Sequence, residues 1–224
     1  MRRIKFALGI LVFTLGLTAY GPSESGATPT GLNNIPTAEA VGEGELVLQA
    51  FSEFGRECEP GWFAGFKYGP AANWEVGLDD IFAGPGSAGG PTLQAKHRTV
   101  LGDRAALALG AANVSTDRSR HGDVFPYAAV TGDLGPLRLH LGRSWQSDNK
   151  AWFVGLDTPM DEAITLRADW TQVQDGEESI ASVGFIRSLR ARWLLEGWAS
   201  FPSTEGAETS YVLKLDFVAP LRRD

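Results

Sequence analysis

The feature of the sequence that most constrains its fold is an alternation of apolar and polar residues, which recurs in about a dozen segments along the chain. In the last of these segments, 210–217, large apolar side chains at every second position alternate with a set that includes Lys214 and Asp216. A period of two predicts a β-strand with two chemically different faces. Repeated along a chain that begins with an export signal, it predicts an all-β fold: an antiparallel, up-and-down transmembrane β-barrel of about 12 strands.

The first residues have the pattern of a signal peptide. A positively charged start is followed by an apolar core, 6–19, and then by the small residues Ser25 and Ala27 at the positions that a signal peptidase reads. The apolar core is shorter than the ~20 residues that a membrane-spanning helix needs. We therefore expect a cleavable signal peptide over 1–27, an extended N-terminal periplasmic segment over 28–43, the barrel over 44–219 and a short C-terminal tail over 220–224.

The charge of the chain disfavours nucleic acid as a partner. Residues 1–27 hold three of the 20 basic residues and one of the 27 acidic residues, so 17 basic and 26 acidic residues remain after cleavage. Binding to phosphates calls for a basic face, and this excess is acidic. Cys58 is the only cysteine and lies in a polar stretch, so an internal disulfide is excluded and a free thiol is expected.

Glycine, proline, aspartate and asparagine interrupt the alternation at intervals typical of strands. Tight turns such as 69–71 and 102–103 alternate with longer polar connections such as 83–90 and 116–122, as expected when the two rims of a barrel differ. The connection 147–149 is short for the long-loop rim. The twelve predicted strands, with boundaries good to about three residues, are 44–54, 61–69, 72–82, 92–101, 104–115, 123–133, 135–146, 150–158, 162–174, 178–188, 190–201 and 208–218.

Aromatic residues are expected in two belts, because Trp and Tyr favour the two interfaces of a bilayer. The belt near the long loops comprises Trp62, Tyr127, Trp145, Trp152, Trp170, Phe201 and Tyr211. The belt near the short turns comprises Tyr68, Trp74, Phe185, Trp193 and Phe217. The alternative is a soluble periplasmic β-barrel that binds an apolar ligand and turns the same apolar face inward. A dry core opposite so many charges would be unfavourable.

Charged residues occupy the opposite face of the strands, which in a membrane barrel faces the lumen. Both signs occur, so opposite charges can pair across strands. Barrels of eight strands are filled by side chains and those of sixteen leave a channel, so the sequence leaves open a narrow polar pore and an interior closed by ion pairs. The lumen-lining candidates are Lys67, Glu75, Asp79, Lys96, Arg98, Arg138, His140, Arg167, Asp169, Arg192, Glu196, Lys214 and Asp216.

Two motifs resemble binding or catalytic sites in their sequence but not in their structural context. The stretch 84–89 has the spacing of a dinucleotide-binding loop, but Pro91 opens another strand instead of the helix that this loop needs. The adjacent carboxylates at 79–80 and at 177–178 point to opposite faces of a strand, so each pair is a poor acid–base dyad. We expect no cofactor.

The histidines likewise provide no catalytic or metal site. His97, His121 and His140 lack the spacing of metal ligands. No Ser–His or Asp–His pair lies at one strand end in a setting typical of a nucleophile and its base. We therefore expect no catalytic residue and no metal, and an outer-membrane barrel enzyme remains as a second alternative.

The residues after the signal peptide, T-G-L-N-N-I-P-T-A over 30–38 and G-E-G-E-L over 42–46, resemble the opening of the YjbH-type outer-membrane β-barrels. That family is associated with exopolysaccharide production, so the resemblance implies an outer-membrane location and a link to export of surface polysaccharide. It implies no catalytic residues. From the residues themselves, Pro29 and Pro36 favour an extended chain, which is able to tuck into the periplasmic mouth of a barrel.

We therefore expect an integral outer-membrane β-barrel that acts as a small pore or as a structural or export component of the cell envelope. Its expected partners are the lipid of the outer membrane and the barrel-assembly machinery. The sequence does not indicate a solute.

Overall fold

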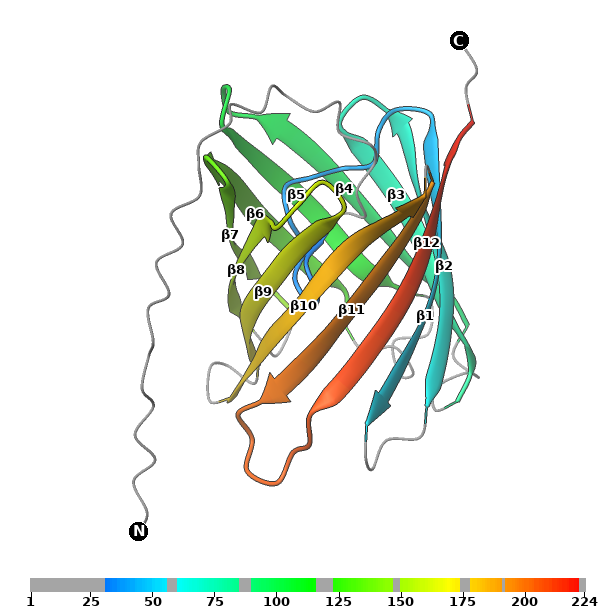
Figure 1. The fold of residues 1–224 in the computed structure, drawn as a ribbon, viewed down its shortest axis with the longest axis vertical. Coiled ribbons are helices and arrows are strands. Elements are labelled where there is room, and N and C mark those ends of the chain that lie inside the picture. The colour runs from blue at the N-terminus through cyan, green and yellow to red at the C-terminus, as the bar shows by residue number, and fades with distance from the viewer. Residues whose placement is uncertain are drawn as a thin grey trace.

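The computed structural model describes residues 31–55, 60–84, 90–115, 123–146, 150–173, 178–190 and 192–221. The predicted signal peptide, Cys58, His121 and most of the stretch 84–89 lie outside these residues. Twelve antiparallel strands close into one barrel, in which each strand pairs with its neighbours in the sequence and the last strand pairs with the first (Figure 1). Among the described residues, no helix is long and apolar enough to cross a membrane.

The prediction of a 12-strand, up-and-down barrel is confirmed. Each end of each strand lies within three residues of its predicted position. The strands are β1 (Glu45–Gly55), β2 (Gly61–Ala71), β3 (Trp74–Ala83), β4 (Thr92–Val100), β5 (Ala105–Val114), β6 (Phe125–Leu134), β7 (Leu137–Ser144), β8 (Trp152–Pro159), β9 (Ile164–Val173), β10 (Glu178–Arg190), β11 (Trp193–Pro202) and β12 (Ser210–Pro220).

The two ends of the barrel differ as predicted. We call the rim with the short connections the turn end; it also holds the start of β1 and the end of β12, and lies uppermost in Figure 1. We call the opposite rim the loop end, where the loop between β11 and β12, 203–209, projects downward. The connection between β7 and β8 spans 145–151 and is therefore longer than the sequence indicated, which makes it typical of the loop end.

The apolar face of the strands lies on the outside of the barrel. Trp74, Leu166, Trp193 and Leu213 are exposed by 47%, 41%, 43% and 51% respectively. The soluble-barrel alternative requires these side chains to be buried in the core, so the structure contradicts it. A continuous apolar exterior of this kind indicates contact with another apolar phase, which for a closed barrel is lipid.

One aromatic residue of the predicted belts faces the other way. Tyr127 is buried inside the barrel, where its ring packs at 5.9 Å from that of Phe125. In β6 the odd-numbered residues from Phe125 to Thr131 form the inner face, because Thr131 pairs across to the buried His140. The prediction that placed Tyr127 on the outside was therefore wrong by one step of the alternation.

The chain before β1 runs inside the ring of strands. Residues 31–44, which we call the N-terminal segment, enter the lumen and return to β1 at the turn end, as the blue trace in Figure 1 shows. Leu32, Ile35, Ala38 and Val41 of this segment are all buried. The barrel interior is thus a layer of inward side chains around a length of its own chain.

Candidate functional site in the barrel lumen

The N-terminal segment contacts apolar side chains at three levels of the lumen. Leu32 and Ile35 pack with Tyr127, Ala129 and Phe153. Closer to the turn end, Ala38 packs against two small side chains of β5 and Val41 against two valines of β1 and β12, in the clusters Ala38, Ala106 and Ala108, and Val41, Val47 and Val218. Burial of these side chains stabilises the segment in the lumen by the hydrophobic effect, at ~25 cal/mol for each Å² removed from water.

Glycines in the wall provide the room for the segment. A Cβ atom at Gly155 would lie 2.7 Å from Cδ1 of Ile35, and one at Gly184 would lie 2.8 Å from Oδ1 of Asn33. At the turn end a Cβ at Gly69 would lie 2.8 Å from the carbonyl oxygen of Val41. Real Cβ atoms do not approach other atoms so closely, so these positions admit the segment because they have no side chain.

Asn34 anchors the segment to three strands. Its Nδ2 donates hydrogen bonds to Oγ of Ser182 at 2.6 Å and to Oγ of Ser200 at 2.9 Å. Its backbone N–H donates to the carboxylate of Asp169 at 3.3 Å. Because β9, β10 and β11 each contribute one of these partners, the segment is tied to three adjacent strands.

A chain of hydrogen bonds links the middle of the segment to the charged wall. The N–H of Ala38 donates to Oγ1 of Thr131 at 3.0 Å, and this hydroxyl lies 2.8 Å from Nδ1 of His140. Nε2 of the same imidazole lies 3.0 Å from Oδ2 of Asp157. Since a carboxylate only accepts, Nε2 donates to Asp157, and in the neutral imidazole Nδ1 then accepts from the Thr131 hydroxyl.

Arg138 closes this chain back onto the segment. Its guanidinium donates two hydrogen bonds to Asp157, at 2.8 and 3.0 Å, and also pairs with the carboxylate of Glu39. Paired donors in this fork geometry are among the stronger polar contacts in proteins. The segment therefore contributes one carboxylate to an ion-pair network that otherwise belongs to β7 and β8.

Two further contacts at the turn end hold the backbone of the segment. The N–H of Val41 donates to Glu75 at 3.0 Å, and Nζ of Lys96 donates to the carbonyl of Thr37 at 3.4 Å. Glu75 and Lys96 are themselves an ion pair with an N–O distance of 3.7 Å. Seven of the twelve strands, β3, β4, β6, β7, β9, β10 and β11, thus supply a polar partner to residues 34–41.

A second buried network lies on the wall between β9 and β12. Glu196 accepts from Arg167 at 2.7 Å and from Lys214 at 3.1 Å, and Lys214 also lies 3.4 Å from Asp216. These four side chains come from β9, β11 and β12, and all are at least nine-tenths buried. Opposite charges at this depth compensate one another, since an unpaired buried charge costs several kcal/mol, on the order of 3–5.

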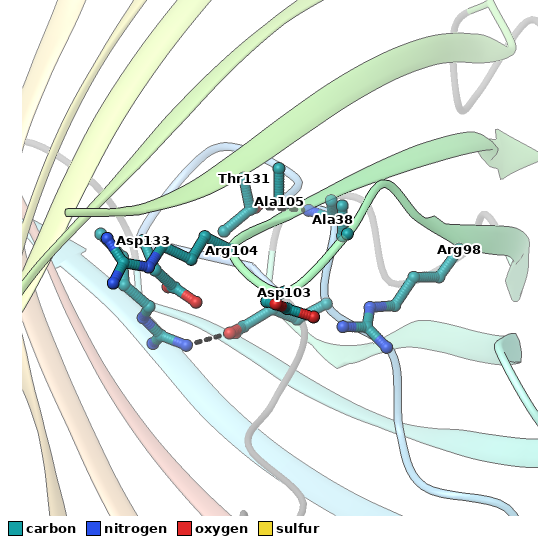
Figure 2. Close-up of a pocket in the computed structure, with 11 residues that line it drawn as sticks. Ala38, Arg98, Asp103, Arg104, Ala105, Thr131 and Asp133 are labelled. Carbon is teal, nitrogen blue, oxygen red and sulfur yellow. Dashed lines mark hydrogen bonds and ion pairs between the residues drawn. The ribbon is translucent and has the colours of Figure 1, made fainter. Parts of the chain in front are cut away.

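A small cavity remains beside the segment at the turn end (Figure 2). Its volume is about 100 Å³, and Arg98, Asp103, Arg104 and Asp133 surround it together with Glu39 and Arg138. This volume suits a few water molecules.

In the loop-end half of the wall, no ion pair joins the acidic side chains to a cation among the described residues. Asp79 accepts hydrogen bonds from Nε2 of Gln49 at 2.7 Å and from Nε2 of Gln94 at 3.0 Å. The carboxylate reaches β1 across Gly65, where a Cβ would lie 3.1 Å from its Cγ. On the same wall the rings of Phe51 and Phe63 stack with centroids 4.5 Å apart.

Twelve of the thirteen lumen-lining candidates belong to the inward-facing positions of their strands. Glu75, Lys96, His140, Arg167, Asp169, Glu196, Lys214 and Asp216 are buried, and Lys67, Asp79, Arg98 and Arg138 are half-buried. Arg192 differs: it is exposed in the turn between β10 and β11. β11 begins at Trp193, so the alternation that turns Glu196 inward does not extend back to Arg192. The pairing of β10 with β11 also shifts near this turn, between Ser188 and Arg190.

The sequence did not indicate three parts of this site. The hydroxyl of Thr131, the amide of Asn34 and the wall glycines became visible only when the strands were placed side by side. A weak signal exists for the glycines, because Gly155 and Gly184 fall at inward positions of otherwise regular strands, where glycine marks a close approach of another backbone or group.

Thr131, His140 and Asp157 form a hydroxyl–imidazole–carboxylate chain, yet its setting is that of a structural contact. His140 is 1% exposed, and the Thr131 hydroxyl is covered by the N–H of Ala38. A nucleophile must reach its substrate, which this hydroxyl cannot do with the segment in place. No group of three or more His, Cys, Asp or Glu side chains that could hold a metal ion occurs within the described residues.

The closed barrel of twelve antiparallel strands, with an apolar exterior and a charged lumen, is the architecture of outer-membrane porins. No family model matches the chain, and no curated protein matches it. The YjbH resemblance therefore rests on residues 30–46 alone.

Solved structures do match the fold. The KdgM porin in complex with disordered oligogalacturonate is similar with a TM-score of 0.60 and 9% identity, over 77% of this chain and 98% of that chain. The NanC porin is similar with a TM-score of 0.56 and 12% identity, over 77% of this chain and 98% of that chain. An outer-membrane channel from Pseudomonas putida F1 is similar with a TM-score of 0.50 and 14% identity, over 90% of this chain and 100% of that chain. At these identities the likeness establishes the fold.

Proposed function

We propose that this protein is an outer-membrane channel for small solutes, and that its own N-terminal segment closes the lumen. The observation that carries the proposal is the position of residues 31–44, which lie inside the barrel and contact strands around most of its wall. A barrel of twelve strands is wider than the eight-strand barrels that side chains alone can fill. The extra width is taken up here by chain, so the lumen opens when that chain leaves.

The contacts of the segment fit a part that docks and leaves. Its polar links to the wall are separate hydrogen bonds, each contributing about 1 kcal/mol, and one ion pair between Glu39 and Arg138. Its apolar contacts are divided among three small clusters. The ion pairs of the wall survive its departure, because Arg138 keeps Asp157 and Lys96 keeps Glu75. Opening therefore leaves no wall charge of these pairs without a partner.

The outer-membrane location is part of the proposal. The apolar exterior, the aromatic residues at both rims and the porin-like fold support it, as do the predicted signal peptide and the expected route through the barrel-assembly machinery into outer-membrane lipid. Salt or osmotic shock is expected to leave the protein in the membrane fraction, and its release by either treatment would contradict this location.

The test is a lock between the segment and the wall. Ala38→Cys with Ala108→Cys, in a chain with Cys58→Ser, places two thiols in one packed cluster. In a planar bilayer we expect current through the reduced protein and its loss after oxidation, with recovery on addition of reductant. Each single-cysteine variant is the control and is expected to ignore the oxidant. Equal currents in the oxidised and reduced forms overturn the plug, and silence of all forms overturns the channel.

A structural role in the envelope, without conduction, is the second candidate. The burial of the N-terminal segment inside the barrel favours it, because a chain that stays in the lumen narrows any path for a solute. A link to exopolysaccharide export rests on the N-terminal resemblance alone. Deletion of the gene followed by measurement of secreted polysaccharide tests this link, and an unchanged yield would remove it.

A further inference from the structure

The charges of the lumen are sorted along its axis. By the alternation of the described strands, six basic and ten acidic residues face inward. The basic residues are Lys67, Lys96, Arg98, Arg138, Arg167 and Lys214, and the acidic residues are Glu45, Glu53, Glu75, Asp79, Asp133, Asp157, Asp169, Glu178, Glu196 and Asp216. The last four residues of each strand at the loop end contribute Glu53 and Glu178 to the inner wall, and no lysine or arginine.

Four of the six basic residues are already paired. Lys96, Arg138, Arg167 and Lys214 each form an ion pair with a wall carboxylate. In contrast, no ion pair joins Glu53, Asp79, Asp169 or Glu178 to a cation in the described part of the chain. The uncompensated charge of the loop-end half is therefore negative.

Asp79 is the best-defined of these charges. Its two oxygens are held by the amides of Gln49 and Gln94, which orient the carboxylate without neutralising it. Gln49 is 7% exposed, and its Oε1, an acceptor, is buried without a hydrogen-bond partner. A carboxylate beside an unpartnered amide oxygen invites a donor or a cation.

The neighbouring aromatic pair suits the same class of solute. Phe51 is next but one to Gln49 on the inner face of β1, and it stacks on Phe63. The faces of aromatic rings carry negative charge density and attract cations. The wall near Asp79 therefore combines a fixed negative charge with an aromatic surface.

We propose that the channel selects for cations, and that Asp79 is the residue of the inner wall that contributes most to this selection. The inference rests on the proposed channel function and deepens it. Potassium ions and small organic ammonium ions are the solutes that this wall favours, because a cleft lined by one sign of charge concentrates the opposite ion. Acidic saccharides, such as the oligogalacturonate bound to the KdgM porin, are disfavoured.

The experiment is the reversal potential of the full chain in a planar bilayer under a gradient of KCl. We expect the permeability to potassium to exceed that to chloride by about threefold or more. Asp79→Asn is expected to reduce this ratio by about half, since the amide keeps the shape and loses the charge. Gln49→Lys, which sets an ammonium against Asp79, is expected to bring the ratio to about one.

The adjacent Asp80 provides the matched control. It pairs with Ala64 on the outward face of β3, so Asp80→Asn removes the same charge one residue away without changing the lumen. Its ratio is expected to equal that of the unmodified protein. Heat-modifiable mobility on gels verifies that each variant is folded.

The outcomes separate this inference from the function on which it rests. Current with a reversal potential of zero, or displaced toward chloride, overturns the selectivity and leaves the channel intact. An equal change in Asp79→Asn and Asp80→Asn overturns the role of Asp79. Absence of current in every variant overturns the channel and the inference together.

Discussion

Ile35 of the N-terminal segment lies directly over Gly155 of β8, and a Cβ atom at position 155 would stand 2.7 Å from its Cδ1. The contact couples the inner wall to the segment at one of the wall glycines, where no side chain fills the space. The Leu32 side chain occupies the same site. Substitution of this glycine therefore acts on the docking of the segment before it acts on the barrel.

Gly155→Val is expected to weaken docking of the segment by about 1–3 kcal/mol, the usual cost of overpacking a filled site. The expected readout is a higher open probability in a planar bilayer. Gly132→Val is the control, because a Cβ at Gly132 meets nothing within 4 Å. The role assigned to Gly155 would be wrong if both variants opened the channel equally.

Asn34→Ala removes two hydrogen bonds to the wall, from Nδ2 to Ser182 and to Ser200. The expected loss of docking free energy is about 1 kcal/mol for each bond. A spin label at Ala40→Cys, in the Cys58→Ser chain, measures the change as a larger mobile fraction of the segment, since Ala40 is half-buried and belongs to none of the three apolar clusters.

The double variant with Ser182→Ala tests whether the contact itself is responsible. If the bond accounts for the effect, the two substitutions together cost less than the sum of the single ones, because they remove the same interaction. Strict additivity would show that Asn34 does not dock through Ser182.

Glu196→Gln takes away the carboxylate that both Arg167 and Lys214 contact, at 2.7 and 3.1 Å. A buried charge left with a weakened partner costs about 3–5 kcal/mol. The free energy of unfolding, measured in urea with the protein in lipid vesicles, is expected to fall by this amount. Glu162→Gln, in the exposed turn between β8 and β9, is expected to change it by less than ~0.5 kcal/mol. A similar loss in both would refute the network.

The strands and their two faces were predictable because alternation is a local signal. Leu213 faces outward and Lys214 inward for a reason visible in the sequence of β12 alone. The two errors each concern the face of the barrel that was assigned to a single residue. Tyr127 falls on the inner face of β6, and Arg192 lies past a shift in strand pairing.

The path of the N-terminal segment could be predicted only as far as the mouth of the barrel. Pro36 favours an extended chain, but the burial of the segment depends on Gly155 and Gly184, which are far in the sequence from Asn33 and Ile35. Those glycines form a site only after the barrel has closed. The hydroxyl of Thr131 is likewise a ligand for Ala38 only in the closed barrel, so no sequence motif encodes it.

Charge substitutions on the outer face test whether the apolar band lies in hydrocarbon. Leu109 is 57% exposed at the middle of β5, and Thr99 is exposed on the same face near the turn end of β4. Arginine facing lipid costs about 2–4 kcal/mol at the bilayer midplane and about 0–1 near an interface. We therefore expect Leu109→Arg to lower the free energy of folding into vesicles by the larger amount and Thr99→Arg by the smaller. Equal costs at the two positions would mean that the band does not follow the depth of a bilayer, because a uniform environment penalises an arginine equally along the strand.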